Sequence, residues 1–155
     1  MDVFAHFFWT YLVYWTHPKR FIAGVIGVLP DLCSFGPFMI GRLLRSGFVF
    51  GRPDGIPTYV YFLYDITHSF VIFAAVALFL WYVARPAVFL LGGWGLHIII
   101  DIPTHTDAFF PTPVLWPLFD VSFNGISWGT WWFMLLNYGA LLSLFTYLRW
   151  KVPHT

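Results

Sequence analysis

The chain has 155 residues, of which 59% are hydrophobic and only 10% are charged. Soluble domains carry about 25% charged residues, so this composition argues against an ordinary soluble domain and favours a single integral membrane domain, residues 1–155. A net charge of +1 gives no basis for a nucleic-acid partner, and the single cysteine, Cys33, excludes an intrachain disulfide and a cysteine-rich zinc site.

Apolar segments follow one another along the chain, and each predicts a helix. The first, residues 3–16, has no basic leader and no small-residue cleavage site, so we expect a short, retained helix. The second covers residues 21–32 and continues as an amphipathic stretch over residues 38–44. A loop rich in glycine and proline, residues 47–57, separates it from the third segment. That segment, residues 59–84, is long enough to span a bilayer.

Two further segments complete the predicted bundle. The fourth covers residues 87–102 and is stopped by Pro103, and the fifth covers residues 128–150. The intervening loop, residues 104–127, contains prolines but is rich in aromatic residues, so we expect it to rest on the membrane surface or to cover a site. The sequence therefore predicts an all-α integral membrane bundle with about four to five membrane-embedded helices and no substantial sheet.

Histidine and aspartate residues interrupt these apolar segments. His97 and Asp101 are four residues apart, and Asp65 and His68 are three apart, so each pair lies on one face of a helix. His105 repeats the four-residue spacing after Asp101. Threading the segments alternately through a bilayer brings both pairs to one membrane side. His6 and Asp31 fall on the same side. Ionisable groups inside a membrane are costly and usually functional, so we expect one shared polar site.

Imidazole and carboxylate groups together suit zinc, manganese or iron. We expect a divalent transition metal, with zinc as the first choice. The strongest candidate ligands are His68, His97 and Asp101, followed by Asp31 and His6 and then by Asp65 and His105. The set is large enough for one metal with supporting partners or for two bridged metals. Singly, each residue also has an ordinary interpretation, such as a hydrogen-bonded core histidine or an aspartate that caps a turn.

Basic residues fall on the other membrane side in this threading: Lys19, Arg20, Arg85, Arg149 and Lys151. The positive-inside rule makes that side cytoplasmic. We therefore expect a cell (inner) membrane protein whose site faces the outside or the periplasm.

Three arginines lie on the site side and weaken this orientation. Arg42, Arg45 and Arg52 would instead bind an anionic substrate, because a guanidinium group grips phosphate in a bidentate way. Trp116, in the apolar loop, would anchor the wall of a lipid-accessible opening at headgroup depth. Alternatively, the apolar segment around it is a plug that packs between helices and only stabilises the fold.

Several short motifs occur in a characteristic order: His6, Leu29-Pro30-Asp31, Thr67-His68-Ser69, His97-x-x-x-Asp101, Thr104 and Leu115-Trp116-Pro117. This series resembles the YdjM-type family of membrane-bound metal-dependent hydrolases over residues 5–117. The resemblance implies a membrane-embedded metal site. In that family His-Arg often precedes the Thr-His-Ser motif as HRxxTHS, whereas Leu63 and Tyr64 stand there in this chain. If that histidine is a ligand in relatives, Asp65 or His105 substitutes for it or the site is reduced.

Two classes of function fit these features. In the first, the chain is a hydrolase in which a metal-activated water attacks an ester or phosphoester of a lipid or lipid-linked substrate, with Asp65 as general base. In the second, it is a non-catalytic membrane protein with a structural metal or haem site, or an ion carrier. Mixed histidine and aspartate ligands suit an open catalytic site, and together with the family resemblance they favour the hydrolase. No sequence feature indicates an oligomeric state.

Overall fold

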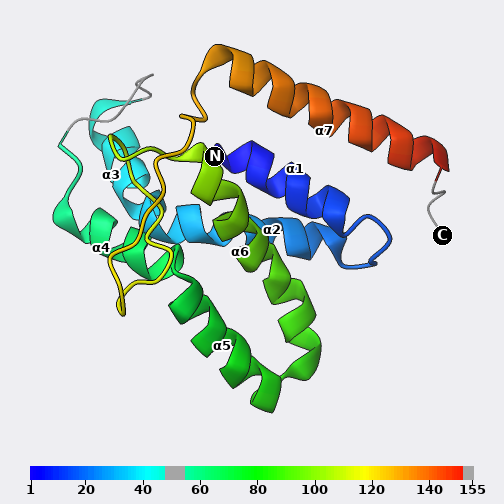
Figure 1. The fold of residues 1–155 in the computed structure, drawn as a ribbon, viewed down its shortest axis with the longest axis horizontal. Helices are drawn as coiled ribbons and strands as arrows, with labels where there is room; N and C mark the ends of the chain where they lie inside the picture. Colours follow the sequence, from blue (N-terminus) through cyan, green and yellow to red (C-terminus); the bar gives the residue numbers. More distant parts are fainter. Residues whose placement is uncertain (48–54, 152–155) are drawn as a thin grey trace.

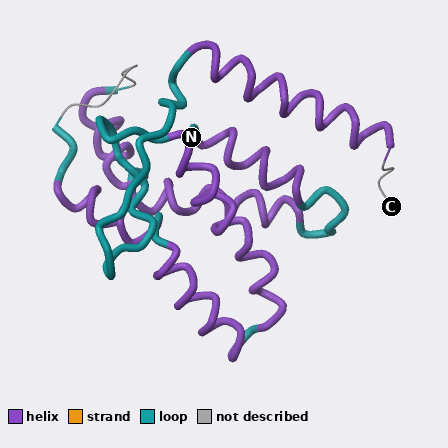
Figure 2. The backbone as a smooth tube through the Cα atoms, viewed as in Figure 1, coloured by secondary structure: helices purple, strands orange, loops and turns teal. Residues whose placement is uncertain are grey.

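The computed structural model describes residues 1–47 and 55–151, and all the regular secondary structure in these two ranges is helical (Figures 1 and 2). The described residues form the helices α1 (Val3–Val13), α2 (Arg20–Ser34), α3 (Gly36–Ser46), α4 (Thr58–Thr67), α5 (Phe70–Val83), α6 (Arg85–Thr104) and α7 (Trp131–Lys151). The all-α prediction is confirmed for this part of the chain.

Helix α2 lies at the centre of the bundle and packs against α1, α4 and α6. Helix α5 packs against α6, and α7 runs alongside α1 at the edge of the bundle (Figure 1). Figure 2 shows the long loop between α6 and α7 lying beside α3 and α4. In this loop Phe110 is buried against Tyr64 of α4 and the ring of Phe35, so the loop is a packed part of the fold.

The prediction of one continuous helix over residues 59–84 is wrong. The chain breaks between α4 and α5, which are bent by 56° relative to each other. His68 ends α4 with a non-helical backbone conformation, and Ser69 caps α5 by accepting hydrogen bonds from the backbone N–H groups of Val71 and Ile72. A serine side chain can replace the missing backbone partners at a helix start, which stabilises the break.

The other predicted boundaries lie close to the observed ones. Helix α6 begins at Arg85, two residues before the predicted start at Ala87, because proline is well tolerated in the first helical turn. It also continues past Pro103 to Thr104, so the expectation that Pro103 stops the helix is wrong. Helix α2 ends at Ser34, and α3 follows after a bend of 64°.

Helices α6 and α7 are long and apolar enough to cross a membrane. The count rises to four if each of the bent pairs, α2 with α3 and α4 with α5, is one broken span. Helix α1 is apolar but has only 11 residues. By length and composition, two to four crossings are therefore compatible with a membrane protein.

Glycines allow the central helices to approach closely. A Cβ atom on Gly93 of α6 would lie 2.7 Å from the carbonyl oxygen of Ala23 on α2, and a Cβ atom on Gly27 would overlap the side chain of Thr10 on α1. Neither position has room for a side chain. Helices α1, α2 and α6 therefore pack closely, which brings their polar residues together in the interior.

Candidate metal centre

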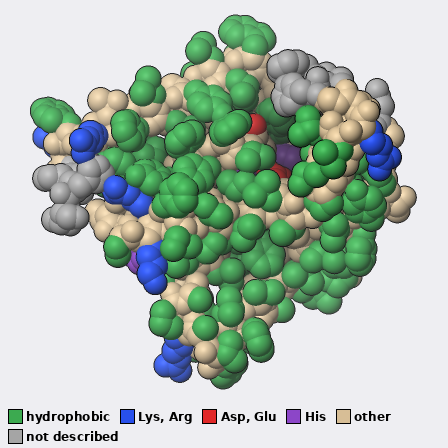
Figure 3. Space-filling model, turned by 180° about the vertical axis from the view of Figure 1, so that it is seen from behind, with side chains coloured by type: hydrophobic (Ala, Val, Ile, Leu, Met, Phe, Trp, Pro, Cys, Tyr) green, Lys and Arg blue, Asp and Glu red, His purple; other side chains and the backbone are tan. Residues whose placement is uncertain are grey.

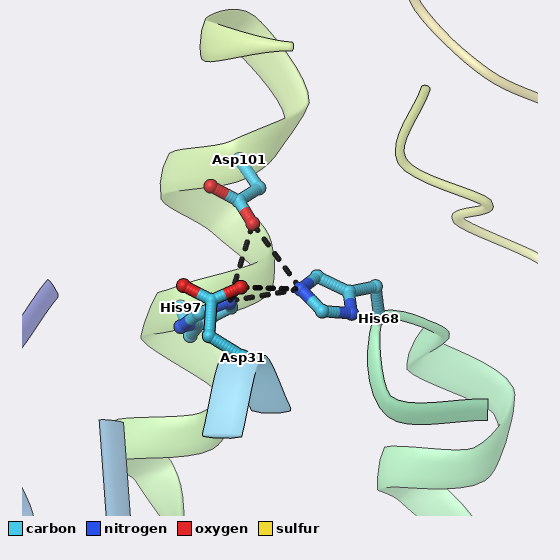
Figure 4. A group of neighbouring side chains, drawn as sticks. All are labelled: Asp31, His68, His97 and Asp101. Carbon is cyan, nitrogen blue, oxygen red and sulfur yellow. Dashed lines mark hydrogen bonds and ion pairs between the residues drawn. The ribbon is translucent and has the colours of Figure 1, made fainter. Parts of the chain in front are cut away.

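Four sequence-predicted ligands meet in the interior of the bundle. Asp31 comes from α2, His68 from the break between α4 and α5, and His97 and Asp101 from successive turns of α6 (Figure 4). All four residues are buried, and one ligand atom of each lies within 4.8 Å of the others. Residues from three separate segments thus form one group that could hold a metal ion.

Backbone carbonyls determine which ring nitrogen of each histidine faces the group. Nδ1 of His97 lies 2.6 Å from the carbonyl oxygen of Gly27, and Nδ1 of His68 lies 3.1 Å from that of Tyr64. A carbonyl oxygen only accepts hydrogen bonds, so Nδ1 must carry the proton in both rings. In the neutral rings Nε2 then has a free lone pair, which is how histidine binds metals.

The spacing of the ligand atoms matches a small tetrahedral site. The Nε2 atoms of His68 and His97 are 3.0 Å apart. Oδ2 of Asp101 lies 3.1 Å from Nε2 of His97 and 3.4 Å from Nε2 of His68. Oδ1 of Asp31 lies 3.6 Å from the His68 Nε2 atom and 3.8 Å from the His97 Nε2 atom. Metal–ligand bonds of about 2.0–2.1 Å in tetrahedral geometry separate the ligands by about 3.3 Å. The separations given above, 3.0–3.8 Å, are close to this value, so the group could hold a metal ion.

Among the described residues, the polar atoms of the group do not all have hydrogen-bond partners. Oδ2 of Asp101 is buried and accepts no hydrogen bond from the described residues. Two neutral Nε2 atoms at 3.0 Å would direct their lone pairs at each other. A protonated imidazole would neutralise only one of the two carboxylates, whereas a divalent cation would balance both and satisfy the nitrogen lone pairs. The donor set therefore fits a divalent metal.

A haem group does not fit between these histidines. Axial ligands bind iron from opposite faces of a porphyrin. The Nε2 atoms of His68 and His97 are only 3.0 Å apart, which leaves no room for the macrocycle. Of the predicted alternatives, the paired-histidine haem site is therefore unsupported at this pair.

Two more predicted ligands contact the other oxygen of Asp101. Nε2 of His6 lies 3.0 Å from Oδ1, and Nε2 of His105 lies 3.4 Å from it. The amino group of Met1 also contacts this oxygen. His105 is the residue that caps the end of α6, with an extended backbone conformation, so it is off the helix. These groups contact Oδ1, whereas His68 and His97 face Oδ2, and the ring of His6 stacks on that of His97 with centroids 3.6 Å apart.

The remaining predicted site residues lie outside this group. Asp65 is half-buried on α4, and no hydrogen bond or ion pair among the described residues joins it to the ligands. Arg42 and Arg45 of α3 line a cavity of about 360 Å³ together with Ser46. Arg52 lies outside the described residues. Trp116 packs its ring edge on Phe62, and its carbonyl oxygen accepts a hydrogen bond from Ser69 at the helix break.

Sequence reasoning missed two functional neighbours. Tyr64 stacks its ring on His68 with centroids 3.7 Å apart, and its hydroxyl group donates to the Phe110 carbonyl oxygen at 2.9 Å. Its four-residue spacing from His68 is the signal that was available. The Gly27 carbonyl that orients His97 has no signal in the sequence, because every residue carries such an acceptor.

Asp31 is the most exposed of the four residues. Its side chain keeps 11% of its exposure, whereas those of the other three residues are fully buried. Figure 3 shows histidine and acidic side chains in a recess of an otherwise mainly hydrophobic surface. An apolar cavity of about 320 Å³ is lined by residues that include Pro30 and Thr67. These two residues directly precede Asp31 and His68 in the sequence.

No protein-family model, no curated protein and no solved structure matches the chain.

Proposed function

We propose that the chain is a membrane-embedded, metal-dependent hydrolase. His68, His97 and Asp101 would bind a divalent transition metal, most often zinc, through Nε2, Nε2 and Oδ2. The observation that carries the proposal is the convergence of these buried atoms at 3.0–3.4 Å, with an Asp101 oxygen that accepts no hydrogen bond from the described residues. The motif resemblance to membrane-bound metal-dependent hydrolases points the same way.

Asp31 would serve as the proton acceptor. Its distances to the two histidine nitrogens, 3.6 and 3.8 Å, are the longest in the group, and it alone keeps contact with the surface. Catalytic zinc sites use three protein ligands and leave one position for water, whereas structural sites use four. When bound, a divalent ion acidifies water and polarises an ester or phosphoryl oxygen. The Asp31 carboxylate stands where it can hold that water and take its proton.

This assignment differs from the sequence-based choice of Asp65 as general base. Asp65 stays a prediction for which no contact with the ligand group gives support. A general base must reach the proton that it abstracts within about 2.6–3.2 Å or through one water. Asp31 lies next to the coordination position that would be left for water, so it is better placed than Asp65 to act as the general base.

The proposed substrate is an ester or phosphoester of a lipid or lipid-linked molecule. Large apolar side chains are exposed over much of the surface, including Leu44, Tyr82 and Trp150 at 78–81% exposure. Such a surface suits lipid contact. The apolar cavity beside Pro30 would accept an acyl chain near the metal. Arg42 and Arg45 would bind a phosphate group, and Trp116 would stand at headgroup depth.

The proposed location is the cell (inner) membrane, with the site toward the outside or the periplasm. The support is the distribution of basic residues in the sequence, which places Lys19, Arg20 and Arg85 on the side away from the ligands. Cysteine labelling from either side of the membrane at residue 85 and at residue 107 tests this orientation. Labelling of both from the same side would contradict it.

The decisive experiment combines metal analysis with turnover. Detergent-purified wild type should bind metal and hydrolyse chromogenic phosphoesters or esters, His97→Ala should lose both, and Asp31→Asn should keep the metal but lose turnover. His17→Ala and Asp107→Asn are matched controls, because these residues lie outside the ligand group.

Each other outcome has a definite meaning. Metal-free wild type would refute the metal site. Loss of metal in Asp31→Asn would make Asp31 a fourth ligand and the site a closed, structural one. Metal binding without turnover of any ester or phosphoester would reject the hydrolase.

A further inference from the structure

Asp101 presents its two oxygens to two different sets of nitrogen atoms. Oδ2 faces Nε2 of His68 and His97, at 3.4 and 3.1 Å. Oδ1 faces Nε2 of His6 and His105, at 3.0 and 3.4 Å. All of these residues are buried. One carboxylate therefore lies between two pairs of histidines.

The rings of His6 and His97 lie side by side, and each contacts one oxygen of Asp101 in the same way. They stack with centroids 3.6 Å apart and an interplanar angle of 19°. Each ring directs Nε2 to its own oxygen of Asp101, at 3.0 Å for His6 and 3.1 Å for His97. Ions bound by two parallel rings at this spacing would lie about 3.5–4 Å apart, which is the separation found in two-metal sites.

His105 adds a second nitrogen on the Oδ1 side. Its Nδ1 lies 2.7 Å from the carbonyl oxygen of Phe110, so Nδ1 carries the proton and the neutral ring has its lone pair on Nε2. That lone pair faces the Oδ1 oxygen of Asp101 at 3.4 Å, and a cation that contacts both atoms would balance their negative potential. The amino nitrogen of Met1 contacts Oδ1 and lies 3.0 Å from Nε2 of His105, so an ion bound here would displace it from this position.

We propose that Nε2 of His6, Nε2 of His105 and Oδ1 of Asp101 form a second site for a divalent transition metal. Asp101 would bridge this ion and the one held by His68 and His97. Nδ1 of His6 has no hydrogen-bond partner among the described residues, so it can accept the proton that Nε2 must give up when an ion binds. The inference rests on the metal site proposed above and extends it from one ion to two.

Two ions would narrow the substrate class. Together they would carry four positive charges, against two negative charges on Asp31 and Asp101. The excess positive charge favours an anionic substrate, and paired ions at this separation suit the displacement at a phosphorus centre, where both the attacking and the leaving oxygen need stabilisation. A phosphoester is therefore preferred over a carboxylic ester.

The test is metal stoichiometry in the full-length, detergent-purified chain. After chelation, the protein is titrated with Zn²⁺ and washed, and bound metal is measured by mass spectrometry. We expect two ions per chain in wild type and one in the double variant His6→Gln, His105→Gln, with His17→Gln as the matched control that keeps two.

A second measurement needs no variant. Wild type loaded with Mn²⁺ should give the electron paramagnetic resonance spectrum of a spin-coupled pair, because the bridging carboxylate holds the ions about 3.5–4 Å apart. A single ion in wild type, with the Mn²⁺ spectrum of isolated ions, would overturn the second site and leave the hydrolase proposal standing, with the Met1 amino group as the partner of Oδ1. No bound metal at all would reject both proposals.

Discussion

Replacing Gly93 with alanine should weaken metal binding, although residue 93 is not a ligand. A Cβ atom there would lie 2.7 Å from the Ala23 carbonyl oxygen, and ordinary contact begins at 3.4 Å, so α6 must move away from α2 by about 0.7 Å (3.4 minus 2.7). The obstacle is backbone, which cannot rotate aside. His97 lies one helical turn further along the same face of α6, so its ring would move with the helix.

The site tolerates less movement than this. Metal–ligand distances are held within about 0.2 Å of their ideal values, and the Gly27 carbonyl that orients His97 is on α2, the helix being pushed away. Loss of such an orienting bond costs about 10–100-fold in metal affinity. Overpacking should also lower the free energy of unfolding by about 1–3 kcal/mol.

Competition with a chelating dye measures the zinc affinity, and chemical unfolding in detergent measures the stability. Gly139→Ala is the matched control, because a Cβ atom on that glycine of α7 meets nothing within 4 Å. It should leave the zinc affinity unchanged. A Gly93→Ala protein with wild-type zinc affinity would refute the argument that the contact between α2 and α6 sets the ligand geometry.

Three further results are expected. Chelation should lower the thermal unfolding midpoint of wild type but not of His97→Ala. Zinc at about 100 times its dissociation constant adds about 2.7 kcal/mol of stability to the protein that binds it. An equal fall of the midpoint in both proteins would show that the chelator does not act through this metal site. Ser69→Ala should reduce the free energy of unfolding by about 1–2 kcal/mol by removing the cap of α5, and Ser143→Ala, on an exposed face of α7, should change it little. Arg42→Gln should raise the KM for a phosphoester several-fold and leave that for a neutral ester unchanged, and equal effects on both substrates would argue against a phosphate contact.

Local patterns in the sequence predicted most of the helices and the four polar residues that meet in the interior. Apolar runs predict helices because each backbone hydrogen bond joins residues four apart, so the pattern and the structure share one short range. The pairing of His97 with Asp101 is equally local, and both residues are in the ligand group. Asp65 follows the same kind of rule with His68, yet it is outside the group, because sharing a helix face does not specify what that face meets.

Contacts between distant residues depended on the tertiary structure. At the break after His68, the Ser69 hydroxyl group donates a hydrogen bond to the carbonyl oxygen of Trp116, 47 residues away. A count of apolar residues reveals neither this contact nor the capping of α5 by Ser69. The orientation of His97 depends on the carbonyl oxygen of Gly27, 70 residues away, which is identical in sequence terms to every other carbonyl. The division of the histidines between the two oxygens of Asp101 follows from how closely α1, α2 and α6 pack. That distance is set by the space beside Gly93, and a linear pattern of residue types does not contain it.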